Sequence, residues 1–142
     1  MLISEILRRK GSNVVTAKPD ASVAELIGLL GEHQIGAVVV ADSSGTVGIV
    51  SERDVVRRLA DVGADVLSQK LSELMSTEVI SCGPDDSVDD IGAQMTERRI
   101  RHLPVLAEGK LVGIITIGDV VAARIHELEK TRVQLESYIT QG

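Results

Sequence analysis

The amino-acid sequence repeats itself at an offset of 65 residues. Residues 15–23 read VTAKPDASV, and residues 80–88 read ISCGPDDSV. Residues 47–56 read VGIVSERDVV, and residues 112–121 read VGIITIGDVV. The register between the two copies needs no gap. Two copies form a pseudo-symmetric pair and not a stacked array, which needs at least three repeats.

The size of the repeat indicates that the two copies fold together. Each copy takes about 65 of the 142 residues, and a unit of that size buries too little surface to be comfortably stable alone. A lead-in also repeats, as ISEIL at residues 3–7 and LSELM at residues 71–75. We predict a first repeat at residues 1–68, a second at residues 69–126 and a C-terminal helical extension at residues 127–142.

The composition argues against several classes of protein. The net charge is −6, and the chain has no tryptophan, no phenylalanine and a single tyrosine. It therefore lacks the basic surface that neutralises nucleic-acid phosphates and the aromatic platforms on which bases stack. No apolar run reaches the roughly 18 residues of a membrane span, and the lone Cys82 has no partner for an internal disulfide. We expect a cytoplasmic protein that binds neither nucleic acid nor membranes.

Hydrophobic patterns predict the order β-α-β-β-α in each copy. Ser22 and Glu25 form a capping box in front of a helix, and the continuous apolar run 37–41 fits a buried strand. The connection 60–70 is predicted to be a loop with a little helix. The predicted strands are residues 14–16, 37–41, 47–50, 79–81, 103–106 and 111–115, and the predicted helices begin at Val23, Glu52, Val88 and Ile117. This order indicates the α/β class, with two small sheets that each lean on helices.

The last helix is predicted to run past its counterpart in the first copy. Apolar residues recur along it at steps of three, four or seven, and Arg132 interrupts the stripe. The apolar positions are Val121, Ile125, Leu128, Leu135 and Ile139. Such a stripe needs a partner surface. The helix either packs back on its own domain or pairs with a second copy of the chain, and we favour the homodimer.

Two strand-to-helix junctions form the strongest candidate site. Each places a hydroxyl, Ser51 or Thr116, where a helix begins, and an aspartate, Asp54 or Asp119, one turn further on. The free N–H groups of a helix start suit a phosphate, and an aspartate can accept both hydroxyls of a ribose. The same spacing also makes an ordinary helix cap. Because the junction occurs twice at matched positions, we favour ligand binding.

A basic segment before one strand is the second candidate. Arg101 and His102 lie next to the strand, and arginine side chains suit phosphate groups. Arg98 and Arg99 follow a helix and fit either a solvated helix end or a ligand contact. Pro104 within a strand indicates an edge or an opening, because proline cannot donate to a sheet ladder.

Together these residues resemble the CBS-domain family, named for cystathionine β-synthase. The carrying motifs are Pro-Asp-x-Ser-Val, the segment from Arg101 to Val105, and the two Gly-x-x-(Ser/Thr)-x-x-Asp junctions. The resemblance covers residues 1–127 and is to a stand-alone bacterial tandem pair, or Bateman module. It implies two pseudo-symmetric β-α-β-β-α repeats that pack through their sheets, a cleft on each side of the twofold axis, and an extended C-terminal helix.

The resemblance also implies a ligand and the residues that hold it. In the family the clefts bind adenine nucleotides such as AMP, ADP or ATP, or sometimes NAD or S-adenosylmethionine. Asp54 and Asp119 match the ribose-binding aspartate, and Ser51 and Thr116 match the phosphate-side hydroxyl. The other implied ligand-binding positions are Val15, Thr16, Gly36, Ala37, Val38, Arg53, Ile80, Ser81, Arg101, His102, Leu103 and Pro104. Such modules often pair into a flat dimer.

The two copies differ from each other at the predicted site. The first has Gly36 where the second has Arg101, and it has Arg53 where the second has Gly118. The phosphate-binding charge is therefore distributed differently, and we do not expect equal affinity at both clefts.

Three classes of function fit these residues to different degrees. We favour a regulatory module that binds adenine nucleotides between the repeats and signals to a regulated protein partner through a change of conformation or dimer. The alternative is a structural dimerisation protein without a physiological nucleotide. The third class is an enzyme acting on nucleotide phosphates. The sequence offers no general base, nucleophile, metal-ligand set or catalytic cofactor site, so we predict no catalytic or metal-binding residues and no enzyme.

Overall fold

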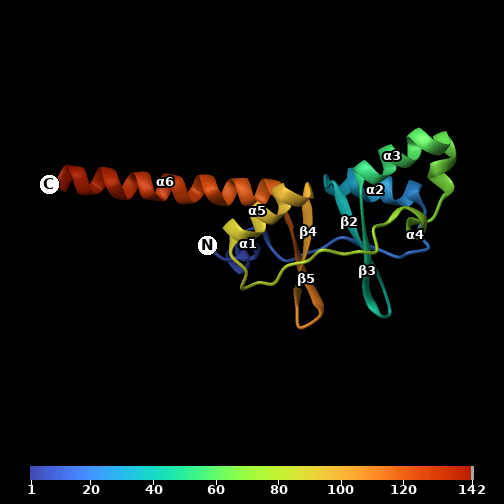
Figure 1. The fold of residues 1–142 in the computed structure, drawn as a ribbon, viewed down its shortest axis with the longest axis horizontal. Coiled ribbons are helices and arrows are strands. Elements are labelled where there is room, and N and C mark those ends of the chain that lie inside the picture. The colour runs from blue at the N-terminus through green and yellow to red at the C-terminus, as the bar shows by residue number, and fades with distance from the viewer. Residues whose placement is uncertain (142) are drawn as a thin grey trace.

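The two halves of the chain form two similar units side by side in the computed structural model, which describes residues 1–141 (Figure 1). The first unit contains β1 (Thr16–Ala17), α2 (Val23–His33), β2 (Ala37–Asp42), β3 (Gly45–Ser51) and α3 (Glu52–Val62). The second contains α5 (Val88–Arg98), β4 (His102–Ala107), β5 (Lys110–Thr116) and α6 (Ile117–Gln141). Connecting segments add α1 (Ile3–Lys10), the short helix η1 (Gly63–Ser68) and α4 (Leu71–Leu74).

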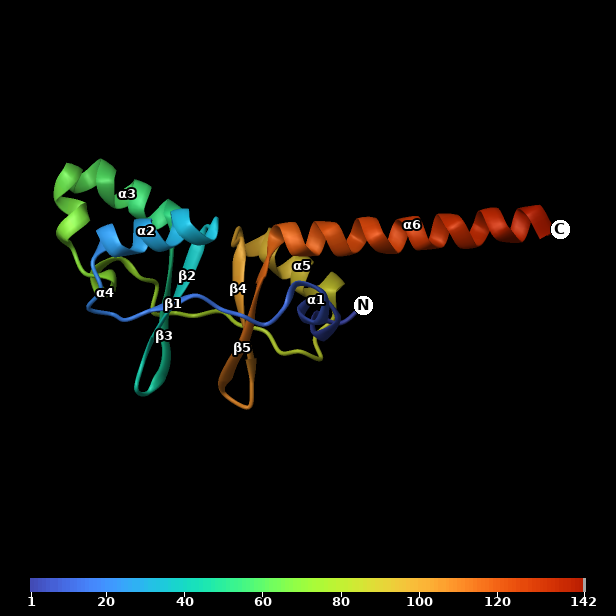
Figure 2. The same ribbon diagram turned by 180° about the vertical axis from the view of Figure 1, so that it is seen from behind.

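The predicted α/β architecture with two small sheets is confirmed. One sheet has the order β1-β2-β3, with β1 parallel and β3 antiparallel to β2, and the other is the β4-β5 hairpin. Residue pairs match at the 65-residue offset, because Ala37 lies opposite Ser51 as His102 lies opposite Thr116. The helices α2, α3, α5 and α6 lie toward one end of the strands, and both hairpin turns lie at the other (Figure 2).

The strand predicted at residues 79–81 is wrong, and Pro104 explains why. In the first half, β1 pairs with β2 at both Thr16–Val39 and Ala17–Val40. In the second half a single parallel bridge joins Cys82 to Val105. The next ladder bond would need the backbone N–H of residue 104 to donate to the preceding strand, and proline has no N–H to give.

The two lead-in segments cross over between the halves. The amide of Ile3 donates to the carbonyl of Asp86 at 3.0 Å, and the amide of Leu71 donates to the carbonyl of Ala21 at 2.9 Å. As a result, α1 completes the hydrophobic core of the second half, and α4 completes that of the first. The hydrophobic cores therefore do not follow a division at residues 68 and 69, and neither half holds a complete core without the other's lead-in.

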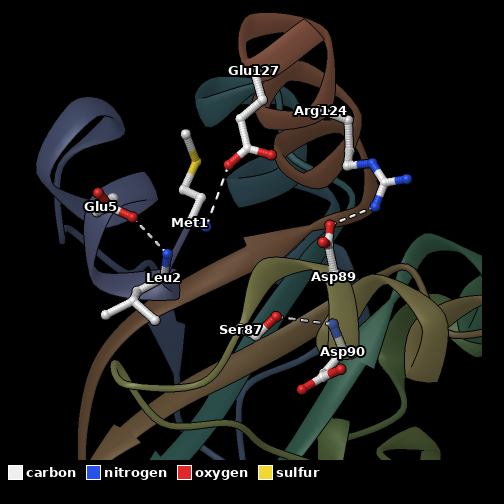
Figure 3. A network of polar contacts seen from close by, with 8 residues as sticks. All are labelled: Met1, Leu2, Glu5, Ser87, Asp89, Asp90, Arg124 and Glu127. Atoms are coloured by element: carbon white, nitrogen blue, oxygen red, sulfur yellow. Dashed lines mark hydrogen bonds and ion pairs between the residues drawn. The ribbon is translucent and has the colours of Figure 1, made fainter. Parts of the chain in front are cut away.

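Polar contacts hold the N-terminus against the second half (Figure 3). The Met1 amino group lies 3.3 Å from Glu127 Oε1 on α6, and Arg124 on α6 pairs with Asp89 on α5. At the start of α1, the Glu5 carboxylate accepts a hydrogen bond from the amide of the N-cap residue Leu2 at 2.6 Å. The Met1–Glu127 ion pair and the backbone hydrogen bonds of Met1 and Ile3 with Val88 and Asp86 join the start of α1 to the second half.

The helix α6 runs without interruption through the predicted extension and projects far beyond the rest of the molecule (Figure 1). Its apolar stripe is exposed, with Leu128 at 69% and Ile139 at 75%. The far part of α6 therefore does not pack back on its own domain, which excludes that alternative for this part of the helix. Gly142 lies outside the described residues.

Candidate functional site

A cleft of about 490 Å³ lies between the two halves, next to the first strand-to-helix junction. The first half contributes Gly36, Ala37, Ile49, Ser51, Glu52, Arg53, Asp54 and Arg57 to its lining. The second half and the connection contribute Ser76, Glu78, Ile80, Arg98, Arg99, Ile100, Arg101 and His102. The cleft is thus lined by the first junction, from the first half, and by the segment before β4, from the second half, so it exists only where the two halves meet. We call it the first cleft.

The first junction is both a helix cap and a part of the cleft wall. The Ser51 amide donates to Asp54 Oδ2 at 2.8 Å, and the Asp54 amide lies 3.4 Å from Ser51 Oγ. The capping interpretation of this spacing is therefore confirmed. Every hydrogen bond that residues 1–141 make with this carboxylate goes to Oδ2, so Oδ1 is left for another donor.

Five arginines line the first cleft: Arg53, Arg57, Arg98, Arg99 and Arg101. None of them forms an ion pair with a carboxylate within residues 1–141. The acidic residues in the lining are Glu52, Asp54 and Glu78. Positive charge therefore exceeds negative charge in this cleft, in a protein whose net charge is −6. Guanidinium groups held in this way suit an anion with several oxygens.

The end of α5 directs the basic segment into the cleft. Arg99 ends the helix in the left-handed backbone conformation, with φ 56°, and Gln34 ends α2 in the same way at the matched position. The chain turns there, and Arg101 and His102, the first residue of β4, follow at the cleft edge. Arg98 and Arg99, which the sequence left open between solvent and ligand, both line the cleft.

His102 lies where the two halves meet. A Cβ atom on Gly36 would be 3.2 Å from His102 Nε2, so the glycine makes room for the imidazole. Burial lowers the pKa of His102 below its usual range, Arg101 and Lys10 lower it further, and Glu52 and Asp119 oppose that shift. These charges come from both junctions, which places His102 between them.

The second junction has the same backbone geometry and a different environment. The Thr116 amide donates to Asp119 Oδ2 at 2.9 Å, and the Asp119 amide donates to Thr116 Oγ1 at 3.1 Å. The same Oδ2 atom also accepts a hydrogen bond from Lys10 Nζ at 2.7 Å. Neither Thr116 nor Asp119 lines the first cleft.

The structure brings half of the sequence-predicted site residues to the first cleft. The set consists of Gly36, Ala37, Ser51, Arg53, Asp54, Ile80, Arg101 and His102. The remaining predicted residues outside the second junction, which do not line it, are Val15, Thr16, Val38, Ser81, Leu103 and Pro104. Val38 and Leu103 are fully buried in the hydrophobic cores, and Pro104 is buried as well, so their side chains are not available to a ligand there.

Sequence reasoning missed several residues of the first cleft. Arg57 lies one turn beyond Arg53 on α3, so an i, i+4 pattern could have found it. Glu52 and Glu78 gave no such signal. Glu78 reaches the cleft only because the lead-in of the second copy crosses to the first half.

The described residues offer no obvious catalytic centre. Burial raises the pKa of the Cys82 thiol to about 11, so it is not a ready nucleophile at neutral pH. No group of three or more metal-binding side chains occurs within residues 1–141. No helix in this part of the chain is both long and apolar enough to cross a membrane.

Comparison with known proteins identifies the class. The model of the CBS domain matches residues 3–61 and 71–126, so the chain belongs to the CBS-domain family and carries a tandem pair of these domains. The resemblance noted in the sequence is therefore confirmed.

Individual relatives agree with this assignment. The mitochondrial CBS domain-containing protein CBSX3 of Arabidopsis thaliana is 31% identical over 99% of this chain and 72% of its own length. The solved CBS-domain containing protein ATU1752 from Agrobacterium tumefaciens is 46% identical, with a TM-score of 0.85, over 87% of this chain and 99% of that one. The CBS domain pair of protein MJ0100 is 26% identical, with a TM-score of 0.79, over 89% and 98%, and was solved with 5′-methylthioadenosine and S-adenosyl-L-methionine.

Proposed function

We propose that this chain is a regulatory module that binds an adenine nucleotide in the first cleft. The observation that carries the proposal is that Asp54 and five arginines line the same cleft, and that these arginines form no ion pairs within the described residues. A carboxylate with one free oxygen suits a ribose hydroxyl, and the arginines suit the phosphates. The MJ0100 complexes support an adenosine ligand for a related domain pair.

The charge of the cleft favours an anionic nucleotide over a sulfonium ligand. S-adenosylmethionine carries a positive sulfonium and no phosphate, whereas ADP and ATP present several charged oxygens. Arg53, Arg99 and Arg101 would repel the first and pair with the second. We therefore expect ATP and ADP to bind more tightly than AMP, and S-adenosylmethionine to bind weakest of these ligands.

Signalling would follow from the position of the ligand between the halves. A nucleotide bridging Asp54 and Arg101 contacts both halves at once. It therefore stabilises one relative packing of the halves over others, and a ligand shifts an equilibrium only through such a difference in affinity. A regulated protein partner would respond to that change.

We also propose that the chain forms a homodimer through α6. The exposed stripe continues the spacing of a coiled-coil seam, at Val121, Ile125, Leu128, Leu135 and Ile139. Helices in proteins gain most of their stability from the packing of an apolar face, so a partner helix on the exposed stripe would stabilise the projecting part of α6. This contact is also what the alternative function, a structural dimerisation protein, would use.

Thermal unfolding with a panel of ligands tests the nucleotide proposal. The panel is ATP, ADP, AMP, NAD and S-adenosylmethionine, each at increasing concentration. A ligand at 100 times its dissociation constant adds about 2.7 kcal/mol to the free energy of unfolding, which raises Tm by roughly 5–10 °C for a chain of this size. Unchanged Tm with all adenine nucleotides would contradict the proposal and favour the dimerisation protein, and steady ATP turnover would favour an enzyme.

A further inference from the structure

Lys10 is an internal cation beside the aspartate of the second junction. Its Nζ atom lies 2.7 Å from Asp119 Oδ2 and 2.9 Å from the carbonyl oxygen of Ile114. The side chains of Lys10 and Asp119 are 31% and 21% exposed, so the pair is partly shielded from water. Lys10 is the last residue of α1, whose buried residues Ile3 and Ile6 pack in the core of the second half.

The first cleft carries the opposite charge at the matched position. The two lead-ins are related by an offset of 68 residues, which aligns Lys10 with Glu78. The structure supports this alignment, because a Cβ atom on Gly113 would lie 2.5 Å from Leu7 and one on Gly48 would lie 2.6 Å from Met75. Glu78 lines the first cleft and cannot pair with the Asp54 carboxylate, since the two charges repel.

We propose that Lys10 is a built-in competitor that closes the second junction to nucleotides, so that each chain binds one adenine nucleotide, in the first cleft. The nature of the ligand rests on the function proposed above. The hydrogen bonds printed for Asp119 all go to Oδ2, as they do for Asp54, so the difference between the junctions is the ammonium of Lys10 beside the carboxylate. A ribose that approaches Asp119 must compete with this ammonium, which two charge-assisted hydrogen bonds hold in place. In the first cleft no such contact has to be broken, because Asp54 forms no ion pair within residues 1–141.

Lys10 also neutralises the carboxylate in place. At the second junction Gly118 stands where the first has Arg53, so the second junction lacks this arginine as a phosphate partner. Its aspartate, Asp119, is instead paired with the Lys10 ammonium. The exchange of Glu78 for Lys10 therefore determines which of the two junctions is open. This makes Lys10 a residue that sets the number of occupied sites and not a ligand contact.

Calorimetric titration with ATP tests this proposal in a protein whose first cleft binds ATP weakly. Asp54→Asn keeps a capping oxygen and removes the charge, and it provides the background. Lys10→Met keeps the side-chain length and removes the ammonium, and Lys10→Arg keeps the charge as a matched control. We expect Asp54→Asn, alone or with Lys10→Arg, to bind ATP roughly 10- to 100-fold more weakly than the wild type. Asp54→Asn with Lys10→Met should bind one ATP per chain, at least about tenfold more tightly than the background.

The outcomes separate this proposal from the proposed function. If the wild type binds ATP and Lys10→Met opens no second site, the competitor role is wrong while the first cleft stands. If the wild type binds no ATP but Asp54→Asn with Lys10→Met does, the role of Lys10 holds and the first cleft is not the site. Binding by Asp54→Asn that weakens on Lys10→Met would make Lys10 a phosphate contact and overturn the proposal. No binding by any of these proteins would contradict both.

Discussion

The two junctions share one backbone design and differ in the charges around it. In both, a hydroxyl residue at the strand end and an aspartate three residues later cap the following helix. At the first, arginines from both halves line the same cleft as Asp54. At the second, Asp119 is paired with Lys10. A helix cap is therefore the common structural element, and we propose that the residues which the lead-ins and the start of β4 bring to it determine whether it also binds a ligand.

The largest expected effect concerns the other difference between the halves, the length of their last helices. The helix α3 ends at Val62, whereas α6 continues to Gln141 with an exposed apolar stripe. Leu128→Glu places a charge in the centre of that stripe, and burying an unpaired charge is costly. We expect the dimer to dissociate at least about 100-fold more readily, measured by sedimentation. Gln134→Glu adds the same charge off the stripe and should leave the dimer intact. An unchanged mass for both variants would exclude this role of α6.

The next effect compares the two aspartates directly. Asp54→Asn removes the charge that would hold the ribose and should weaken ATP binding roughly 10- to 100-fold. Asp119→Asn makes the same change at the junction already paired with Lys10, and ATP affinity should stay within about twofold of the wild-type value. Calorimetry measures both. A loss confined to Asp119→Asn would reverse the assignment of the clefts.

The cleft arginines should control phosphate binding and leave adenosine unaffected. Arg53→Gln replaces a residue whose counterpart is Gly118, so it makes the first junction more like the second. We expect ATP affinity to fall about tenfold, adenosine affinity to change little, and the salt dependence of ATP binding to become weaker. Lys110→Gln, an exposed change on the β4–β5 hairpin, is the matched control. Equal losses for ATP and adenosine would mean that Arg53 supports the fold of the cleft instead.

The smallest effect is a pH dependence that only the second half carries, because His102 stands where the first half has Ala37. Burial lowers the pKa of His102 in the folded chain, so the unfolded chain takes up a proton first as pH falls. Stability should be fully present above about pH 6.5 and decline below it. Thermal unfolding of His102→Gln should show a shallower decline than the wild type or than His33→Gln, whose histidine is exposed. Parallel curves for all three would contradict this assignment.

The fold could be predicted from the sequence where the pattern was local. The apolar run 37–41 and the Ser22 capping box each specify their element through neighbouring residues, and β2 (Ala37–Asp42) and the cap of α2 are observed. The crossing of the lead-ins could not be predicted in this way, because α1 is completed by contacts with residues about 80 positions away in sequence, such as that of Ile3 with Asp86. The strand predicted at residues 79–81 is missing because of Pro104, a residue of β4. The sequence shows this proline, but it does not show that residues 79–81 would have to pair with it.

The candidate site was predictable in its chemistry and less so in its placement. The repeated motif identified Asp54 and Asp119 as equivalent, and the structure places them in unlike surroundings. The difference comes from Glu78 and Lys10, which lie outside the repeated 65-residue register and become matched only at the offset of the lead-ins. Their positions depend on the crossing of the lead-in segments between the halves, and no single sequence motif predicts that crossing.

The most direct test of the central claim is the number of ATP molecules that the wild-type chain binds in a calorimetric titration. The unequal clefts predict a single class of sites with one ATP per chain, which Asp54→Asn weakens strongly and Asp119→Asn leaves in place. Two equivalent sites per chain, or one site that survives Asp54→Asn and is lost with Asp119→Asn, would contradict the account.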